Sequence, residues 1–122
     1  MARRIVLSID QGTDTSVSVS VTDSTGQAVD IAAARMQLRP TVESETIADE
    51  LATENGRIVL EDGKIRLIFP NAVTTVMEAG AYVYDLEVVD SQDLVTRVME
   101  GPITIRPEVT RDNPEEPESS GS

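Results

Sequence analysis

The sequence predicts an all-β fold: a single antiparallel β-sandwich of about seven strands, with Greek-key connections and no disulfide. Three observations favour this class. Apolar and polar residues alternate with a period of two along most of the chain. Turns rich in Gly, Asp and Pro separate the alternating runs. The 122 residues include no cysteine, so we expect Val, Ile and Leu to supply the core.

The first two strands are expected at residues 5–9 and 16–21. Ile5, Leu7 and Ile9 share one face of the first strand, and the loop DQGTD follows it. The second strand, SVSVSV, places its valines on one face and its serines on the other. This pattern is typical of an antiparallel sheet with one buried and one solvent-exposed face.

A third strand is expected at residues 34–38, after a turn at residues 23–27 (DSTGQ). Alternation places three polar side chains of this strand on the solvent side: Arg35, Gln37 and Arg39. Pro40 ends the strand because proline has no backbone N–H to donate.

Residues 41–53 (TVESETIADELAT) leave two interpretations open. Ile47 and Leu51 lie four residues apart among acidic residues, a spacing that fits one or two turns of helix. An irregular crossover is the other interpretation.

The next two strands, at residues 57–60 and 64–69, are predicted to form a hairpin. Asp62-Gly63 between two alternating apolar runs is a strong hairpin signal. Pro70 ends the second of these strands, and residues 71–77 cross over with room for a single helical turn.

The last two strands are expected at residues 81–89 and 94–105, joined by a turn at Asp90-Ser91-Gln92-Asp93. Gly101-Pro102 interrupts the final strand and predicts a bulge or kink there, since Gly permits one and Pro removes a donor. In the earlier strand, Tyr82, Tyr84, Leu86 and Val88 share one face.

The two tyrosines indicate an immunoglobulin-like sandwich. Such domains carry a tyrosine at the start of the sixth strand whose hydroxyl bonds to upstream backbone, the tyrosine corner. Tyr82 occupies that position, and Tyr84 stands where antibody domains place a cysteine. Glu78 and Gly80, four and two residues before Tyr82, resemble the family pattern. The alternative interpretation is two ordinary half-buried strand tyrosines.

Charge and composition exclude several classes of partner and site. The net charge is −12 with no histidine, which disfavours nucleic acid and anionic membranes. Without His or Cys, nucleophilic triads and most zinc sites are excluded, and three aromatic residues make a glycosidase cleft a poor fit. We therefore predict no enzyme and no cofactor. Asp10, Asp14 and Asp23 could bind calcium, but turn-forming or solvated acids is the simpler interpretation.

The domain is expected to span residues 1–111, with an acidic disordered tail at residues 112–122. The tail DNPEEPESSGS has no apolar anchor. The start, MARRIVLSID, has too short an apolar run for a signal peptide, and no window is apolar enough for a membrane span. These features predict a protein made in a cytoplasm.

Four stretches in order give the chain a wider resemblance: IVLSIDQGTDTSVSVSVTD, STGQAVDIAAARMQLR, NGRIVLEDGKIRLIFP and EAGAYVYDLEVVDSQDLVTRVMEGPITIRPEVTR. Their order and spacing over residues 5–111 resemble small immunoglobulin-like β-sandwich virion proteins of tailed bacteriophages. These proteins sit in collars, baseplates or fibre-attachment rings. The acidic tail is not part of the resemblance.

The resemblance implies a non-enzymatic virion structural protein, assembled in the host bacterial cytoplasm. It would form a homo-oligomeric ring in the tail, neck or baseplate and anchor receptor-binding fibres or spikes. Two alternatives remain open: a capsid decoration or head-fibre-base protein on the same fold, and a bacterial immunoglobulin-like module for adhesion or carbohydrate binding.

Overall fold

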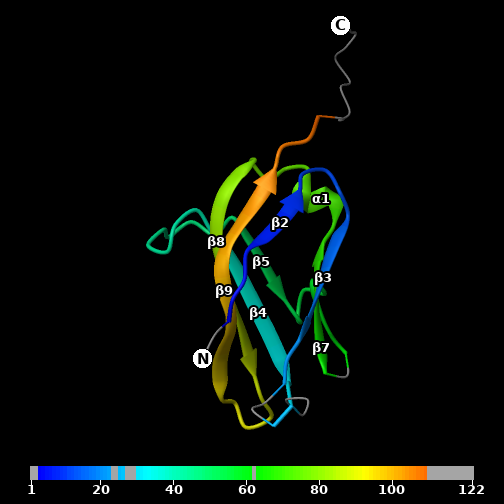
Figure 1. Cartoon of the computed structure of the whole chain (residues 1–122), viewed down its shortest axis with the longest axis vertical. Helices are drawn as coiled ribbons and strands as arrows, with labels where there is room; N and C mark the ends of the chain where they lie inside the picture. The colour runs from blue at the N-terminus through cyan, green and yellow to red at the C-terminus, as the bar shows by residue number, and fades with distance from the viewer. Residues whose placement is uncertain (1–2, 23–24, 27–29, 62, 110–122) are drawn as a thin grey trace, which may run out of the picture.

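The computed structural model describes residues 3–22, 25–26, 30–61 and 63–109. These residues form short strands and one helical turn: β1 (Arg3–Arg4), β2 (Leu7–Asp10), β3 (Thr15–Ser20), β4 (Ala33–Arg39), β5 (Asp49–Ala52), β6 (Ile58–Glu61), β7 (Lys64–Phe69), α1 (Asn71–Thr74), β8 (Gly80–Val89) and β9 (Val95–Arg106). Figure 1 shows the strands in two layers, with the described chain leaving at the end of β9.

The strands form two sheets that pack face to face. The larger sheet has the order β1-β9-β8-β4-β5, with β2 also paired to β9, and the smaller sheet has the order β3-β7-β6. The chain changes sheet at β2–β3, β3–β4, β5–β6 and β7–β8, as Greek-key connections require. The expected immunoglobulin-like β-sandwich is confirmed.

The core lies between the sheets and is built from the inward residues of the alternating strands. Along β8, Tyr84, Leu86 and Val88 are buried, and along β4 the buried residues are Ala34, Met36 and Leu38. Ile65, Leu67 and Phe69 of β7 face them, fully buried. The period of two predicted these faces because alternate strand residues point to opposite sides of a sheet.

The helical interpretation of residues 41–53 was wrong, and the irregular crossover is right only for residues 41–48, because residues 49–52 are a strand. β5 pairs antiparallel with β4, with Leu51 opposite Met36. Leu51 is completely buried, whereas Ile47 is 42% exposed, so the two residues do not share a helical face. A four-residue strand is too short to show a period of its own, and pairing with β4 is what orders it.

Of the first predicted strand, 5–9, residues 7–9 lie in β2, whereas Ile5 and Val6 lie between β2 and the two-residue strand β1 that precedes it. Neither β1 nor β2 is antiparallel to its neighbour. Both pair in parallel with β9, with Arg4 opposite Glu100 and Leu7 opposite Ile103. Val6, between the two strands, is 69% exposed. Parallel pairing was not predicted, since it joins the two ends of the chain and no local pattern reports it.

The predicted irregularity in the last strand lies elsewhere than Gly101-Pro102. Tyr84 is opposite Gly101 and Val83 opposite Pro102 in a continuous ladder. The register shifts instead where Leu86 pairs with Met99 and Glu87 pairs with Arg97, which leaves Val98 as the extra residue of a bulge.

Of the remaining local predictions, some are confirmed and the others concern residues outside the described ranges. Glu61 pairs with Lys64 across the predicted hairpin turn, where Gly63 has φ 72°. The single helical turn after Pro70 is α1, and its buried Thr74 donates to the carbonyl of Thr13 at 2.8 Å. Most of the 23–27 turn and the whole 112–122 tail lie outside the described residues.

An ion pair connects the two sheets at one side. Arg57 donates to both carboxylate oxygens of Asp49, at 2.7 and 3.1 Å, and its Nε donates to the carbonyl of Ile68 at 2.8 Å. The Arg57 and Asp49 side chains are 14% and 9% exposed. The guanidinium also lies over the Phe69 ring, 5.9 Å from its centroid. This contact connects β5 of the larger sheet to β6 and β7 of the smaller one.

Candidate functional site

The two tyrosines of β8 make different backbone contacts. The Tyr82 hydroxyl donates to the carbonyl of Glu78, four residues upstream, at 2.7 Å. Gly80, between them, has φ 145°, a conformation open mainly to glycine. Burial, and to a lesser extent the Glu78 carboxylate, raises the pKa of Tyr82. These residues hold the turn before β8.

Tyr84 connects β8 to the start of the chain. Its hydroxyl donates to the carbonyl of Ile5 at 2.8 Å, and the residue is 4% exposed. Burial raises the pKa of Tyr84 to about 12, with Glu100 also raising it and Arg4 lowering it. Ile5 in turn donates its N–H to the carbonyl of Glu100 at 2.9 Å.

A groove of about 460 Å³ lies on the outer face of the larger sheet. Strand register places its lining residues in three rows across β4, β8 and β9. The first row is Arg39, Val83 and Pro102; the second is Gln37, Asp85, Glu100 and Arg4; the third is Arg35, Glu87 and Arg97. Val42 and the backbone of Gly101 complete the lining, and Tyr84 also borders it.

Two of the groove's arginines are paired with carboxylates. Arg35 contacts Glu87 at 3.1 Å. Arg97 lies 3.5 Å from Asp85 and 3.3 Å from Glu100, two acids that stand directly opposite one another on β8 and β9. The bulge at Val98 makes this possible, since it turns Arg97 outward to stand opposite Glu87.

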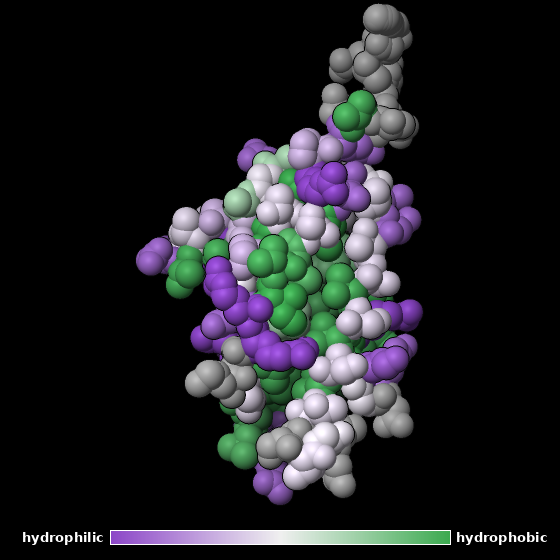
Figure 2. Space-filling view, in the orientation of Figure 1, coloured by the Kyte–Doolittle hydropathy of each residue, from purple (hydrophilic) through white to green (hydrophobic). Residues whose placement is uncertain are grey.

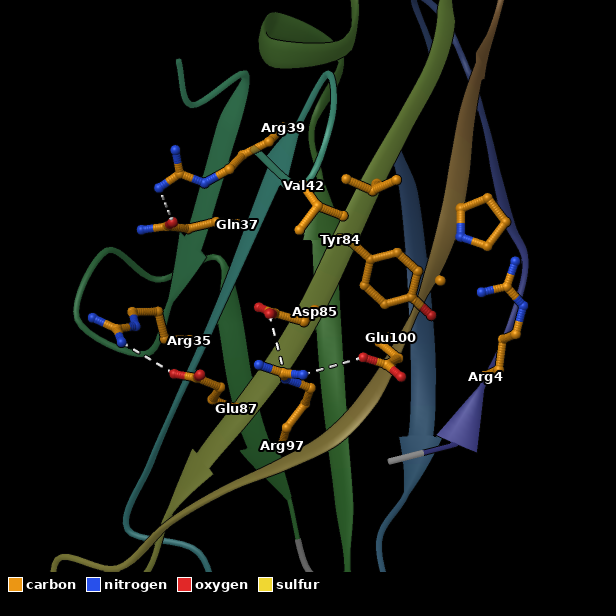
Figure 3. A pocket seen from close by; sticks show the side chains of 13 residues that line it. Arg4, Arg35, Gln37, Arg39, Val42, Tyr84, Asp85, Glu87, Arg97 and Glu100 are labelled. Atoms are coloured by element: carbon orange, nitrogen blue, oxygen red, sulfur yellow. Dashed lines mark hydrogen bonds and ion pairs between the residues drawn. The ribbon is translucent and has the colours of Figure 1, made fainter. Parts of the chain in front are cut away.

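The other two arginines have no carboxylate partner among the described residues. Arg39 donates to the carbonyl of Ser44 and to the Gln37 side-chain oxygen, both at 2.8 Å. Gln37 is itself held by Glu50 at 3.0 Å. Arg4 stands beside Glu100 in the ladder, but Figure 3 shows the Glu100 carboxylate turned toward Arg97 and away from Arg4.

The groove therefore has a positive excess in an acidic protein. Four arginines and three carboxylates line it, whereas the whole chain carries −12. Strand register places the apolar Val83 and Pro102 in the row that begins at Arg39, and Val42 lies between the Arg39 and Arg4 side chains (Figure 3). Such an arrangement suits a ligand that carries carboxylates, because guanidinium groups donate paired hydrogen bonds to them. The sequence indicated the outward side chains of β4, but gave no signal for which strands lie beside it.

The acids considered for calcium have structural contacts. Asp14 accepts the backbone N–H of Asn71 at 2.7 Å, at the start of α1, and Asp10 lies 3.5 Å from Arg106. Asp23 lies outside the described residues. Within the described ranges, no three His, Cys, Asp or Glu side chains gather closely enough to hold a metal ion. The described part of the chain also has no helix of the length and apolarity needed to span a membrane.

Comparison with known proteins supports the fold. No protein-family model and no curated protein sequence matches the chain. Among solved structures, the chain is similar to CopC from Methylosinus trichosporium OB3b, with a TM-score of 0.50, 13% identity, and coverage of 87% of this chain and 90% of CopC. It also matches the extracellular domain of the voltage-gated sodium channel beta4 subunit, with a TM-score of 0.41, 12% identity, and coverage of 89% and 96%. At these identities the CopC match shows a shared sandwich fold.

Proposed function

We propose that this chain is a non-enzymatic structural protein of a tailed-bacteriophage virion. In this role it assembles in several copies in the tail, neck or baseplate region and anchors receptor-binding fibres or spikes. The resemblance of its ordered sequence stretches to that family supports the proposal. The observation that carries it is the unprotected edge of strand β3.

β3 offers backbone groups to a further strand. Among the described residues it pairs with β7 alone. Val21, just past the end of β3, donates to the carbonyl of Gly63 at 3.3 Å. Bonded and non-bonded pairs alternate in an antiparallel ladder, so Ser16, Ser18 and Ser20 direct their N–H and C=O groups away from β7.

The other edges carry the features that discourage strand addition. β5 and β6 have four residues each and include acidic side chains, and β1 and β2 are short and carry Arg3, Arg4 and Asp10. β3 has six residues, TSVSVS, with no charge and no proline. Soluble proteins protect their edge strands by keeping them short or by placing charged residues or proline on them. The β3 edge has none of these features, so it is suited to pairing with a partner strand.

Addition of a strand to β3 gives a physical route to a ring. The partner strand would extend the smaller sheet and cover the side of the sandwich between β3 and the edge of the larger sheet that β1 and β2 form. Figure 2 shows hydrophobic surface along the middle of this face, with hydrophilic side chains on either side. A contact of this kind joins two different surfaces and can repeat from copy to copy. The copies form a closed ring when the rotation between neighbours divides a full turn evenly.

The variant Ser18→Pro tests the edge. Proline removes an outward N–H without removing a bond to β7, and it is tolerated on edge strands. We expect Ser18→Pro to keep the β-sheet circular dichroism spectrum and to lose assembly in sedimentation velocity and negative-stain microscopy. Ser18→Thr, the control, should assemble as the unchanged chain does. Equal assembly by the Pro and Thr variants would contradict a role for this edge.

The virion role is tested on particles. We expect an antibody against the chain to decorate the tail or neck of the encoding phage, and mass spectrometry of purified virions to detect the chain in several copies. Labelling of the head would favour the capsid decoration or head-fibre-base alternative. Absence from virions, with the gene outside any phage region, would overturn the proposal in favour of a bacterial adhesion or carbohydrate-binding module.

A further inference from the structure

We infer that the groove on the outer face of the larger sheet is a receptor for an acidic peptide, and that its occupant is the acidic C-terminal segment of a second copy of this chain. The inference does not depend on the virion role. It rests on the two guanidiniums of Arg4 and Arg39, the apolar surface between them, and the composition of residues 107–122.

One of the two arginines, Arg39, is held in place before any ligand binds. Arg39 is fixed by the carbonyl of Ser44 and the Gln37 side chain, and each of these contacts uses one of the five N–H donors of a guanidinium. The remaining donors are available to a carboxylate. A cation held in place loses less conformational entropy on binding than a freely rotating one.

Charge complementarity selects the occupant. Residues 112–118 read DNPEEPE and carry Asp112, Glu115, Glu116 and Glu118 without a basic residue. Val109, shortly before them, is 92% exposed and matches the apolar surface of Val83 and Pro102. A segment of this kind supplies several carboxylates for the two arginines and, at its N-terminal end, one apolar residue for the Val83 and Pro102 surface.

The direction of β9 favours a second copy over the same chain. Glu100 lines the groove, and from there the strand runs through six further residues to Arg106, roughly 20 Å along an extended strand. The chain is anchored beyond that point, since the N–H of Glu108 donates to the side-chain oxygen of Gln11 at 3.0 Å. Its own C-terminal segment would have to reverse direction to enter the groove, whereas that of a neighbouring copy need not.

The decisive experiment measures self-association of the full chain by sedimentation velocity over a range of concentration and salt. We expect association at low salt that weakens as salt rises, because screening reduces contacts between exposed charges. In the double variant Arg4→Gln/Arg39→Gln, we expect the dissociation constant to rise about tenfold. This is the combined effect of losing two exposed charge contacts, whose free energies add. The matched control, Arg66→Gln/Arg106→Gln, removes the same charge away from the groove, so it carries the same added repulsion between acidic copies. Its dissociation constant should rise much less than tenfold.

A second measurement identifies the occupant directly. A fluorescent peptide of residues 107–122 should bind the full chain, with binding weakened by Arg4→Gln/Arg39→Gln and by Glu→Gln changes at 115, 116 and 118 of the peptide. Failure of the peptide to bind, or binding indifferent to Arg4 and Arg39, would overturn the inference. A full chain that stays monomeric, but binds the peptide once its own Glu115, Glu116 and Glu118 are changed to Gln, would overturn the second-copy assignment by placing the segment in its own groove.

These outcomes are separate from those of the β3 edge. Ser18→Pro leaves the groove unchanged and should not affect peptide binding. The Arg4→Gln/Arg39→Gln variant leaves the β3 edge unchanged. Either proposal can therefore fail while the other stands.

Discussion

The hydroxyl of Tyr84 donates to the carbonyl of Ile5 at 2.8 Å, joining residues 79 positions apart. This bond holds the N-terminal segment where it passes between β1 and β2, beside the last strand. The same carbonyl lies close to Gly101, where an added Cβ would stand 2.6 Å from it. Tyr84, Gly101 and Ile5 thus form one packed junction at the border of the groove.

Replacement of Tyr84 by Phe should lower the free energy of unfolding by about 1 kcal/mol, because it removes the hydrogen bond and leaves the carbonyl of Ile5 without this donor. Tyr82→Phe is the matched control. Its bond to Glu78 is exposed, so water can replace the hydroxyl and the loss should be smaller. Urea unfolding of both variants measures the difference, and an equal loss would argue against a special role for Tyr84.

The Tyr84 bond should also respond to alkaline pH. Folding raises the pKa of Tyr84 from 10.0 to about 12, so the unfolded chain loses this proton first. The stability that the neutral hydroxyl contributes is present below pH 10 and is lost as pH rises through 12. We therefore expect the stability difference between the unchanged chain and Tyr84→Phe to shrink over this range in urea unfolding. A constant difference would contradict the shift.

Gly101→Ala should be more destabilising than Gly80→Ala. The two glycines, Gly101 and Gly80, have nearly equal φ angles of 148° and 145°. An alanine should therefore cause the same backbone strain at both positions, about 1 kcal/mol or more. At Gly80 the added Cβ meets nothing within 4 Å, whereas at Gly101 it meets the carbonyl of Ile5. We expect an additional loss of about 1–3 kcal/mol at Gly101 from this overlap, measured by thermal or urea unfolding.

Combining Gly101→Ala with Tyr84→Phe in one chain extends this test. Because both changes act on the carbonyl of Ile5, their effects should not add in a double-mutant cycle. Additive effects would mean that Gly101 and Tyr84 stabilise the fold independently.

Arg57→Ala should destabilise the sandwich by about 3 kcal/mol. It leaves the mostly buried Asp49 carboxylate unpaired and removes the contact between the two sheets. Arg106→Ala is the control, since its contact with Asp10 is 3.5 Å long and the side chains are 66% and 59% exposed. That change should cost less than about 1 kcal/mol. Similar losses in the two variants would show that the Arg57 pair is no stronger than a surface contact.

Much of the fold was predictable because the buried and exposed faces of a strand appear in the sequence as apolar and polar residues that alternate with a period of two. The segments TSVSVS of β3, ARMQLR of β4 and YVYDLEVV of β8 each identify an inner and an outer face without reference to any other segment. The turn of the β6–β7 hairpin was equally local. These predictions needed only neighbours in the chain.

The candidate groove was not predictable in this way. Its rows combine β4 with β8 and β9, which lie some 50 and 60 residues later in the sequence, and with Arg4 at the other end of the chain. The bulge at Val98 reverses the face of Arg97, so strict alternation would have pointed this arginine inward. β5 was missed for a related reason: its four residues are ordered by β4.

By itself the sequence determined which faces of each strand are apolar, where the chain turns, and that no thiol or imidazole is available for chemistry. The tertiary structure decided which strands lie side by side, that β1 and β2 run parallel to β9, and which of the described strands stand at the sheet edges. The physical reason is that alternation is a local consequence of backbone geometry. Strand order and register, in contrast, depend on the packing of side chains brought together from distant parts of the chain.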